Sequence, residues 1–470
     1  MANLINKFFF SKEKYKLRNA FLLSLLFGIL LLLPVLLKNL FPSKAPLPNW
    51  ERFIFAHLLF LAQFLFYLLH PSCRNVTKIT RYTMGFLLLY LFGCLVSPWL
   101  TGYYRSFQEL IKLESASSFF FLIIYCSYKE PRFSLLQAFS LIGCFIATAE
   151  AVLGLGQYIL QSDLGLQWLG EKSLNLSDAV ATVRLPGGVR WIFDENRPGI
   201  IEILRSYGTF DHPNHLGGFL VISLLLTCHL FLDSKRVKIN KNIMIGALCL
   251  QSLALITTFS RSAWLGATIG IFILLCLRLY RSRGLAQREH LLLFALSASL
   301  CVAVVLFHLP IFHRCFPKYR STERIVESLQ SMTEQDVGDR GRFQGIAQKM
   351  IIQHPWKGVG FHEFVSQTNR FTEFSLWQHL PVHNIYLLVA AEVGLPAAIS
   401  FIIFYILTAY RAMRNSEKEV LAAIWILCGL IGCVDNYFLT SQAGRLLLFS
   451  IAALALISRK KPTCSLVVTV

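Results

Sequence analysis

Apolar runs long enough to cross a lipid bilayer recur from one end of this 470-residue chain to the other. A transmembrane helix needs roughly 20 mainly apolar residues, because the hydrocarbon core is about 30 Å thick and each helical residue rises about 1.5 Å. Only 15% of the residues are charged, against about 25% in a typical soluble domain. The sequence therefore predicts an all-α polytopic membrane protein.

We predict about 12 transmembrane helices, separated by short connections and by two long ones, 162–215 and 312–383. The helices are expected at about 19–40, 52–70, 82–102, 106–127, 134–161, 216–232, 243–260, 262–279, 290–311, 384–410, 419–438 and 445–458. Five lie in 1–161, four in 216–311, and three in 384–470 together with a C-terminal tail. The basic N-terminus leads into a full-length span without a signal-peptide cleavage pattern, so we expect that span to be retained.

The formal net charge of +19 would also suit a nucleic-acid-binding protein. However, Lys and Arg concentrate in the N-terminal segment, in every second connection and at the C-terminus, whereas the short connections between them carry few. That alternation follows the positive-inside rule. It predicts cytoplasmic termini and places both long connections on the outer side of the membrane. We expect no nucleic-acid partner.

Most of the twelve cysteines fall inside predicted spans, and the sequence has no C-x-x-C pair or His/Cys cluster at metal-ligand spacing. We interpret them as small apolar packing residues. The sequence therefore calls for no disulfide framework, no metal and no cofactor.

Arg261 lies in "TTFSRSAWLGATIG", the predicted outer hairpin between the seventh and eighth spans. An arginine without an acidic neighbour is costly at membrane depth. It is either an interface anchor whose charged end reaches water or a binding group for an anion.

The second long connection contains a predicted helix that carries two arginines. Its apolar residues recur at helical spacing on one face: Phe343, Ile346, Ala347, Met350 and Ile351. Asp339 is the expected N-cap, and "HPWKGVGF" ends the helix with proline and glycine signals. Arg340 and Arg342 then occupy the first turn. They are either a solvated charge pair or are brought to the membrane domain when the apolar face packs on it.

Two further stretches place polar groups at the same predicted depth. "RSYGTFDHPNHLGGFL" (205–220) contains Arg205, Asp211 and Asn214, with turn signals at its glycines and proline. We predict these three as substrate-binding residues, with a purely structural role in the loop as the alternative. His383 and Asn384 begin the tenth span, where either could cap the helix.

Together these groups predict a specific chemistry. Two guanidinium groups bind a diphosphate through paired hydrogen bonds. A neutral imidazole is a suitable general base for a hydroxyl group. Cations and a base at a lipid–water boundary are the groups required to react a lipid-linked diphosphate with a hydroxyl, and this chemistry requires no metal.

The stretches "RSYGTFDHPNHLGGFL", "TFSRSAWLG", "GRF" followed by "HPWKGVGFHEF", and "HNIYLLVAAEVGLP" occur in this order between residue 205 and about residue 400. They resemble the lipopolysaccharide O-antigen ligase and polymerase-like membrane protein family. The resemblance implies a GT-C-type glycosyltransferase that takes a glycan from undecaprenyl diphosphate at the periplasmic face, without a metal. For an O-antigen ligase the acceptor is a sugar of lipid A-core.

The resemblance also implies roles for individual residues. Arg261 matches the arginine that binds the donor diphosphate, and His383 matches the general base, with Asn384 beside it as a substrate-binding residue. The family's loop arginine is Arg342 by the "GRF" signature and Arg340 by ungapped spacing back from Pro355. We keep both and favour Arg342.

The sequence leaves alternatives for the function. A connection of about 70 residues is an ordinary size for a ligase, so we favour ligase over O-antigen polymerase or protein O-oligosaccharyltransferase. A transporter would need internal repeats and charges near the membrane midplane. Only Glu150, Glu392 and Asp435 are candidates for such charges, and the sequence shows no repeat.

Overall fold

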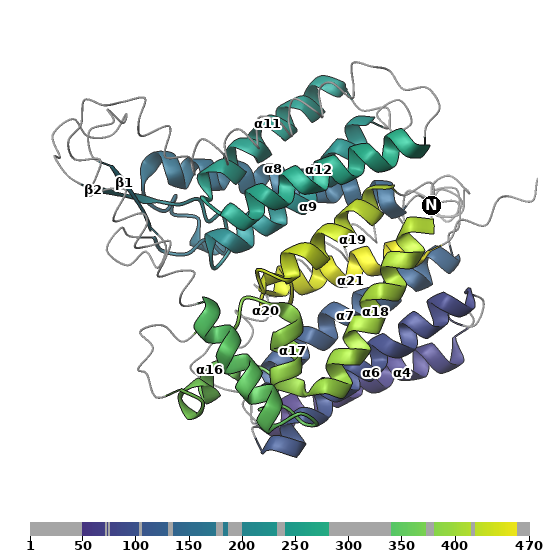
Figure 1. Ribbon diagram of the computed structural model, residues 1–470. Coiled ribbons are helices and arrows are strands. Elements are labelled where there is room, and N and C mark those ends of the chain that lie inside the picture. The colour runs from purple at the N-terminus through teal and green to yellow at the C-terminus, as the bar shows by residue number, and fades with distance from the viewer. Residues whose placement is uncertain are drawn as a thin grey trace, which may run out of the picture.

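The computed structural model describes residues 49–70, 73, 76–102, 106–129, 135–174, 182–186, 200–232, 240–281, 340–372, 380–414 and 419–457. These residues form mainly long helices arranged in two layers (Figure 1). One layer contains α8 (Leu135–Leu160), α9 (Pro213–Leu232), α11 (Lys241–Thr257) and α12 (Arg261–Arg281). The other contains α4 (Asn49–Leu69), α6 (Lys78–Thr101), α7 (Phe107–Lys129) and α18 (Leu395–Arg414). Between them lie α19 (Glu419–Gly432) and α21 (Gln442–Leu456).

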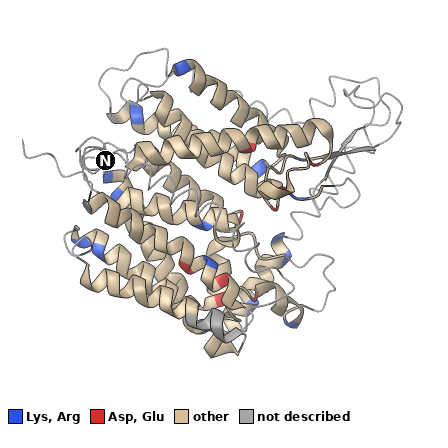
Figure 2. Cartoon of the chain, turned by 180° about the vertical axis from the view of Figure 1, so that it is seen from behind, with Lys and Arg blue, Asp and Glu red and all other residues tan. Residues whose placement is uncertain are grey.

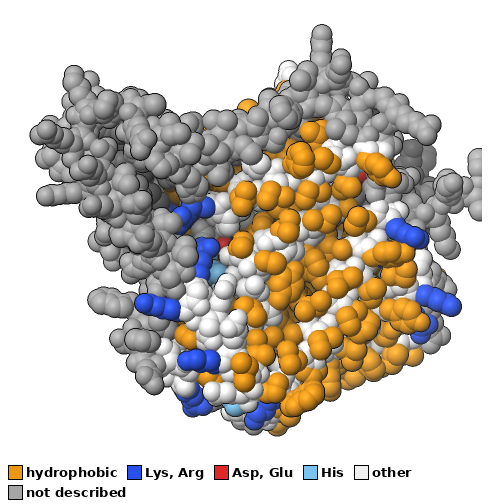
Figure 3. Space-filling view, in the orientation of Figure 1, with side chains coloured by type: hydrophobic (Ala, Val, Ile, Leu, Met, Phe, Trp, Pro, Cys, Tyr) orange, Lys and Arg blue, Asp and Glu red, His pale blue; other side chains and the backbone are white. Residues whose placement is uncertain are grey.

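Within the described residues, six helices are long and apolar enough to cross a membrane: α6, α7, α8, α9, α12 and α18. Four shorter apolar helices, α4, α11, α19 and α21, lie among them. Apolar side chains cover the face of the bundle in Figure 3, and Lys and Arg side chains lie at its two margins. The prediction of a helical multi-pass membrane protein is confirmed. The predicted count of 12 spans stays a prediction, because the spans expected at 19–40 and 290–311 lie outside the described residues.

Helix α9 is the centre of its layer, and it is buried at every position from Leu216 to Leu232. It packs against α8, α11 and α12. A helix that is apolar on all sides is typical of such a central position. Its first turn approaches a neighbour very closely, since a Cβ atom on Gly218 would lie 1.9 Å from the ring of Tyr437. Tyr437 begins the short helix α20 (Tyr437–Thr440), so the glycine allows α20 to lie directly against α9.

Two of the predicted spans are shaped differently in the structure. The tenth is divided at Gly394 into α17 (Ile385–Val393) and α18. Gly394 has φ +92°, a conformation that favours glycine. The eleventh ends at Gly432 rather than at 438, because the chain turns there and the N–H of Asp435 bonds the carbonyl of Ile431 at 2.8 Å. The placement of Asp435 inside a span was therefore wrong, and this residue lies in the connection before α20.

The first long connection contains the strands β1 (Thr182–Pro186) and β2 (Ile200–Leu204), which the sequence analysis did not predict. They pair antiparallel, with Thr182 opposite Leu204 and Pro186 opposite Ile200. The second strand leads directly into Arg205. The strand pair therefore leads the chain toward the start of α9.

The predicted helix of the second connection is present over 340–353. Its expected apolar face is buried, and the residues Phe343, Ile346, Ala347 and Met350 pack with side chains of α16 (Phe364–Gln367) and α17. The expected N-cap, Asp339, lies outside the described residues. The prediction that short helices occur in this connection is confirmed for the described part.

A contact between two glycine-containing turns fixes this helix on the membrane domain. The N–H of Gly360 bonds the carbonyl of Glu392 at 2.9 Å, and the N–H of Leu395 bonds the carbonyl of Pro355 at 2.8 Å. A Cβ atom on Gly358 would lie 2.3 Å from the oxygen of Glu392, and one on Gly394 would lie 2.5 Å from a backbone oxygen of the opposite turn. The two backbones approach this closely because neither glycine has a side chain.

Most of the charged side chains lie at the two ends of the bundle (Figure 2). One exception is Arg445 in α21, which is only 2% exposed and pairs with Glu109 of α7 at 2.9 Å. Its Nε also donates to the carbonyl of Leu439 at 2.5 Å. A buried arginine is tolerated when its charge is paired and its N–H groups are hydrogen-bonded. This pair joins α7 and α21.

Candidate functional site

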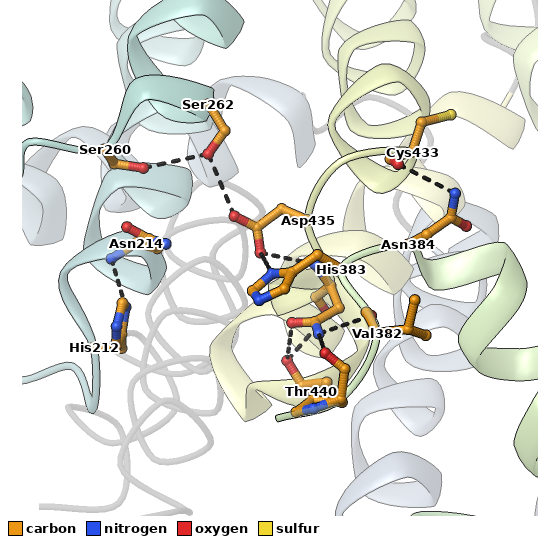
Figure 4. Close-up of polar contacts among 12 residues, drawn as sticks. His212, Asn214, Ser260, Ser262, Val382, His383, Asn384, Cys433, Asp435 and Thr440 are labelled. Atoms are coloured by element: carbon orange, nitrogen blue, oxygen red, sulfur yellow. Dashed lines mark hydrogen bonds and ion pairs between the residues drawn. The ribbon is translucent and has the colours of Figure 1, made fainter. Parts of the chain in front are cut away.

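His383 lies in a bend just before α17, and its neighbours hold this segment in place (Figure 4). Asn384 is the N-cap of α17, with its Oδ1 accepting from the N–H groups of Tyr386 and Leu387 at 3.0 Å. Its Nδ2 donates to the carbonyl of Cys433 at 3.1 Å. Because the Asn384 amide makes these contacts, it acts as a helix cap in this structure, as an asparagine at this position commonly does. Its predicted substrate-binding role stays a prediction.

A second asparagine supports the same segment from the opposite side. Asn436, just before α20, donates its Nδ2 to the carbonyls of Pro381 at 3.2 Å and Val382 at 3.0 Å. These carbonyls belong to the two residues before His383. The backbone that carries the imidazole is therefore tied to both ends of the 433–436 connection.

The imidazole of His383 faces the carboxylate of Asp435, with 3.7 Å between Nδ1 and Oδ1. This separation is slightly longer than a hydrogen bond, and catalytic hydrogen bonds are often long before substrate binds. Asp435 is 3% exposed and His383 is 21% exposed. The carboxylate therefore lies beneath the imidazole, and the second ring nitrogen points away from it (Figure 4).

Several neighbouring groups stabilise the ionised form of the Asp435 carboxyl group. Burial by itself would raise the pKa of its carboxyl group, but the nearby imidazole of His383 lowers it. The N–H of Asn436, at 2.8 Å from Oδ1, acts in the same direction, as does the charge of Arg340. The net pKa of Asp435 lies below its usual value, so its carboxylate is ionised at neutral pH.

Arg261 is brought to the same end of the bundle by the hairpin between α11 and α12. Trp264 closes the hairpin by donating its indole N–H to the carbonyl of Leu255 at 2.8 Å. Arg261 is the first residue of α12 and is exposed. The next residue, Ser262, places its Oγ 3.3 Å from Oδ2 of Asp435. One carboxylate thus contacts both the helix start that carries Arg261 and the imidazole of His383 (Figure 4).

The two candidate loop arginines are placed differently. Arg340 is half-buried at the start of the 340–353 helix, and its charge is close enough to lower the pKa of Asp435. Arg342 is exposed. Although the sequence signature favours Arg342, the structure brings Arg340 toward the carboxylate.

Arg205 joins the 205–220 stretch to the α11–α12 hairpin. Its Nε donates to the carbonyl of Thr258 at 2.6 Å, and its Nη2 donates to Oδ1 of Asn214 at 2.8 Å. The backbone N–H of Asn214 donates to Nδ1 of His212 at 3.1 Å. Arg205 and Asn214 therefore lie near Arg261 and hold each other in place.

His212 lies in the part of the 205–220 stretch that approaches His383 and Asp435. Burial lowers the pKa of its imidazole to about 3, and the charge of Arg205 acts in the same direction. The charges of Asp435 and His383 also act on it, so these groups lie near one another. His212 is consequently neutral at pH 7. By contrast, Asp211 is exposed and pairs with Lys172 of the first connection at 2.9 Å.

The turn before His212 is fixed from α8 by residues that sequence reasoning did not select. Gln157 accepts from the N–H of Gly208 at 2.8 Å, and Glu150 accepts from the N–H of Thr209 at 2.8 Å and from its hydroxyl at 2.6 Å. Gly208 has φ +60°, which this turn requires. Glu150, a candidate midplane charge in the transporter interpretation, thus anchors a loop.

Asp435 and Ser262 are the main residues of the site that the sequence analysis did not assign to it. Asp435 was considered only as a midplane charge. The signal that could have identified it is an Asp-Asn pair ending an apolar run on the side that carries His383. The other candidate midplane charge, Glu392, accepts from the N–H of Phe364 at 3.3 Å.

A comparison with known protein families bears on this arrangement. Residues 246–402 match the model of a family described as O-antigen ligase. The matched segment runs from α11 into α18 and includes Arg261, Arg340, Arg342 and His383. No curated protein matches the chain. The family match confirms the predicted resemblance.

Residues 246–402 are thus similar to an O-antigen ligase family, and they lie within a chain whose described helices include six candidate membrane spans. Members of this family are glycosyltransferase-like ligases and polymerases. The match thus supports an O-antigen ligase- or polymerase-like function.

Proposed function

We propose that the protein is an O-antigen ligase-like glycosyltransferase that moves a glycan from undecaprenyl diphosphate to a hydroxyl of a lipid A-core sugar. The reaction would take place at the periplasmic face of the bacterial inner membrane, with both chain termini in the cytoplasm. The observation that carries the proposal is the convergence of His383, Asp435 and the start of α12 at one end of the bundle. The family match adds independent support.

In the proposed reaction, the donor diphosphate lies against Arg261 and a loop arginine, with its polyprenyl tail in the lipid. Arg340 is the better candidate for the second cation because its charge reaches Asp435. Guanidinium groups stabilise the negative charge that grows on a leaving diphosphate. Arg205 and Asn214 then border the acceptor side through their contact with the same hairpin.

His383 is the proposed general base. Asp435 holds the Nδ1 side of the ring, which leaves the other nitrogen to take a proton from the acceptor hydroxyl. The acceptor oxygen attacks the anomeric carbon as the bond to the diphosphate oxygen breaks, and the diphosphate leaves with the bonding electrons. A single displacement of this kind inverts the anomeric configuration.

The test is glycan transfer by the purified protein with a defined lipid-linked donor and acceptor. We expect His383→Ala and Arg261→Ala to abolish transfer while the protein still inserts and purifies normally. Arg414→Ala is the matched control, because this exposed arginine ends α18 at the opposite end from His383 and has no proposed role in transfer. Full activity of either alanine variant would refute the assigned role, and retention of the anomeric configuration would refute the single displacement.

The same assay separates the related functions. Transfer without any ion gradient would exclude a transport mechanism. In a deletion strain, a ligase defect leaves lipid A-core without polymer while long lipid-linked chains accumulate. A polymerase defect leaves single repeats on the core, and transfer to a protein hydroxyl would identify an O-oligosaccharyltransferase.

A further inference from the structure

Two large apolar side chains are exposed where the 340–353 helix ends. Ile352 is 77% exposed, and Trp356, in the turn that follows, is 78% exposed. The other side chains exposed along this helix are polar or charged: Arg342, Gln344, Gln348, Lys349 and Gln353. The two apolar residues therefore form a distinct patch, which we name the 352/356 surface.

This surface lies at the ends of two candidate membrane spans. The carbonyl of Pro355 accepts from the N–H of Leu395, the first residue of α18, at 2.8 Å. Nζ of Lys357 approaches the carbonyl of Leu100, near the last residue of α6, at 3.5 Å. The turn that carries Trp356 is thus seated on the ends of α6 and α18, which pack against each other.

Exposed apolar side chains continue from this point along both spans. On α18 they are Leu395, Ile399, Ile402 and Ile406, which share one face of the helix. On α6 they are Leu89, Phe92, Trp99 and Leu100. Exposed apolar stripes on helices of this length and hydropathy are the surfaces that face lipid tails. The 352/356 surface is the continuation of the lipid-facing stripe beyond the end of α18.

We infer that the 352/356 surface docks onto the lipid bilayer, in the headgroup region of the leaflet on the side of the site. Tryptophan is enriched at this depth because its ring is apolar while its N–H remains able to bond water or headgroups. The exposed Lys357 beside it places a cation where lipid phosphates lie. The occupant that fits is therefore a lipid surface, and the inference does not depend on the proposed enzymatic function.

Docking at this end would orient the 340–353 helix. A helix over 340–353 is about 20 Å long. Its C-terminal end would be held at the bilayer surface, and its first residue, Arg340, acts on Asp435 at the other end. The helix would thus span the distance from the lipid edge to the candidate site.

The test is fluorescence quenching in vesicles. The purified protein is reconstituted in phosphatidylcholine whose acyl chains are brominated near the headgroup, and in the unbrominated lipid. The signal of Trp356 is obtained as the difference between the wild-type protein and Trp356→Phe. We expect bromine to remove most of this difference signal, and we expect aqueous iodide to quench it weakly.

A matched control places a tryptophan on the polar part of the same helix, as Gln344→Trp combined with Trp356→Phe. We expect this tryptophan to be quenched by iodide and only weakly by bromine. Strong iodide quenching of Trp356 without bromine quenching would overturn the inference, because the ring would lie in water. Protection from both quenchers would also overturn it, because a second copy or another protein would then cover the surface. Equal bromine quenching at 344 and 356 would mean that the apolar end is not the anchored one.

Discussion

Replacing Asp435 by asparagine removes the charge beneath His383 while keeping the size of the side chain. The amide oxygen can still accept from the N–H of Asn436, which lies 2.8 Å from Oδ1 of the carboxylate. The amide NH2 then takes the Oδ2 position and can donate to Oγ of Ser262, 3.3 Å away. The lowered pKa of Asp435 means that the charge is present at neutral pH in the wild-type protein. The variant therefore tests the charge with little change in packing.

The size of the effect follows from the separation of the two groups. At the 3.7 Å between Nδ1 and Oδ1, a full charge on the imidazole would interact with the carboxylate by about 4 kcal/mol at an effective dielectric of about 20. In the proposed mechanism the imidazole gains that charge as it takes the acceptor proton, so the lost interaction raises the free energy of the transition state. Each 1.36 kcal/mol is a factor of ten in rate, so we expect kcat to fall by about 10²- to 10³-fold.

The assay is glycan transfer at varied donor concentration, with thermal unfolding in detergent as the check on folding. We expect kcat to fall while KM for the donor changes little, because the proposed donor contacts are made by arginines rather than by Asp435. Ser262→Ala removes one hydrogen bond to the carboxylate, worth about 1 kcal/mol, and should cost about 5-fold. A folded Asp435→Asn protein with a kcat near that of the wild type would refute the reasoning.

Three further predictions concern the surroundings of the site. Arg340→Ala should reduce transfer by at least about 10-fold, well beyond Arg342→Ala, because the charge of Arg340 acts on Asp435 and such cation contacts are worth about 1.5–3 kcal/mol. Equal loss in the two transfer assays would contradict this assignment. Gly394→Ala should lower the free energy of unfolding by at least about 2 kcal/mol, since its Cβ would lie 2.5 Å from a backbone oxygen at φ +92°. Gly102→Ala, at φ +77° with no atom within 4 Å, should cost only about 1 kcal/mol in the same thermal unfolding measurement, and similar costs would show that the turn contact is unimportant. His212 has a folded pKa of about 3 against 6.5, so the unfolded chain binds the extra proton and stability falls as pH drops from 6.5 toward 3, by at most about 1.4 kcal/mol per pH unit. His212→Gln should make the pH dependence of unfolding shallower over that window, and an unchanged dependence would show that the buried neutral imidazole does not contribute.

The sequence predicted the features that depend on local pattern. The apolar spacing from Phe343 to Ile351 gave a helix whose apolar face is buried, because helical periodicity is a property of neighbouring residues. Hydropathy located the helices for the ten predicted spans that fall in the described residues. The motifs also directed attention to Arg261 and His383, which the structure brings to one end of the bundle.

Features that depend on contacts between residues far apart in the sequence could not be predicted from local pattern. α19 ends at Gly432 within an apolar run, and Asn436 beyond it bonds the backbone of Pro381 and Val382, far away in the sequence. Hydropathy alone therefore predicted a span that extends over Asp435, and it gave no sign of the contact between this residue and His383. Similarly, the choice between Arg340 and Arg342 depends on how the connection is seated by Gly358 and Gly394. Sequence spacing carries no information about that contact.

The position of Asp435 between the two helical layers has a mechanical consequence. Its two oxygens contact different helical segments, Oδ2 facing Ser262 on α12 and Oδ1 facing His383 before α17. A relative slide of the layers would lengthen at least one of these contacts and change the separation of His383 from Arg261. The relative position of His383 and Arg261 therefore depends on how the two helical layers pack against each other. If the protein has the proposed function, a molecule bound between the layers would inhibit glycan transfer without contacting His383 or Arg261.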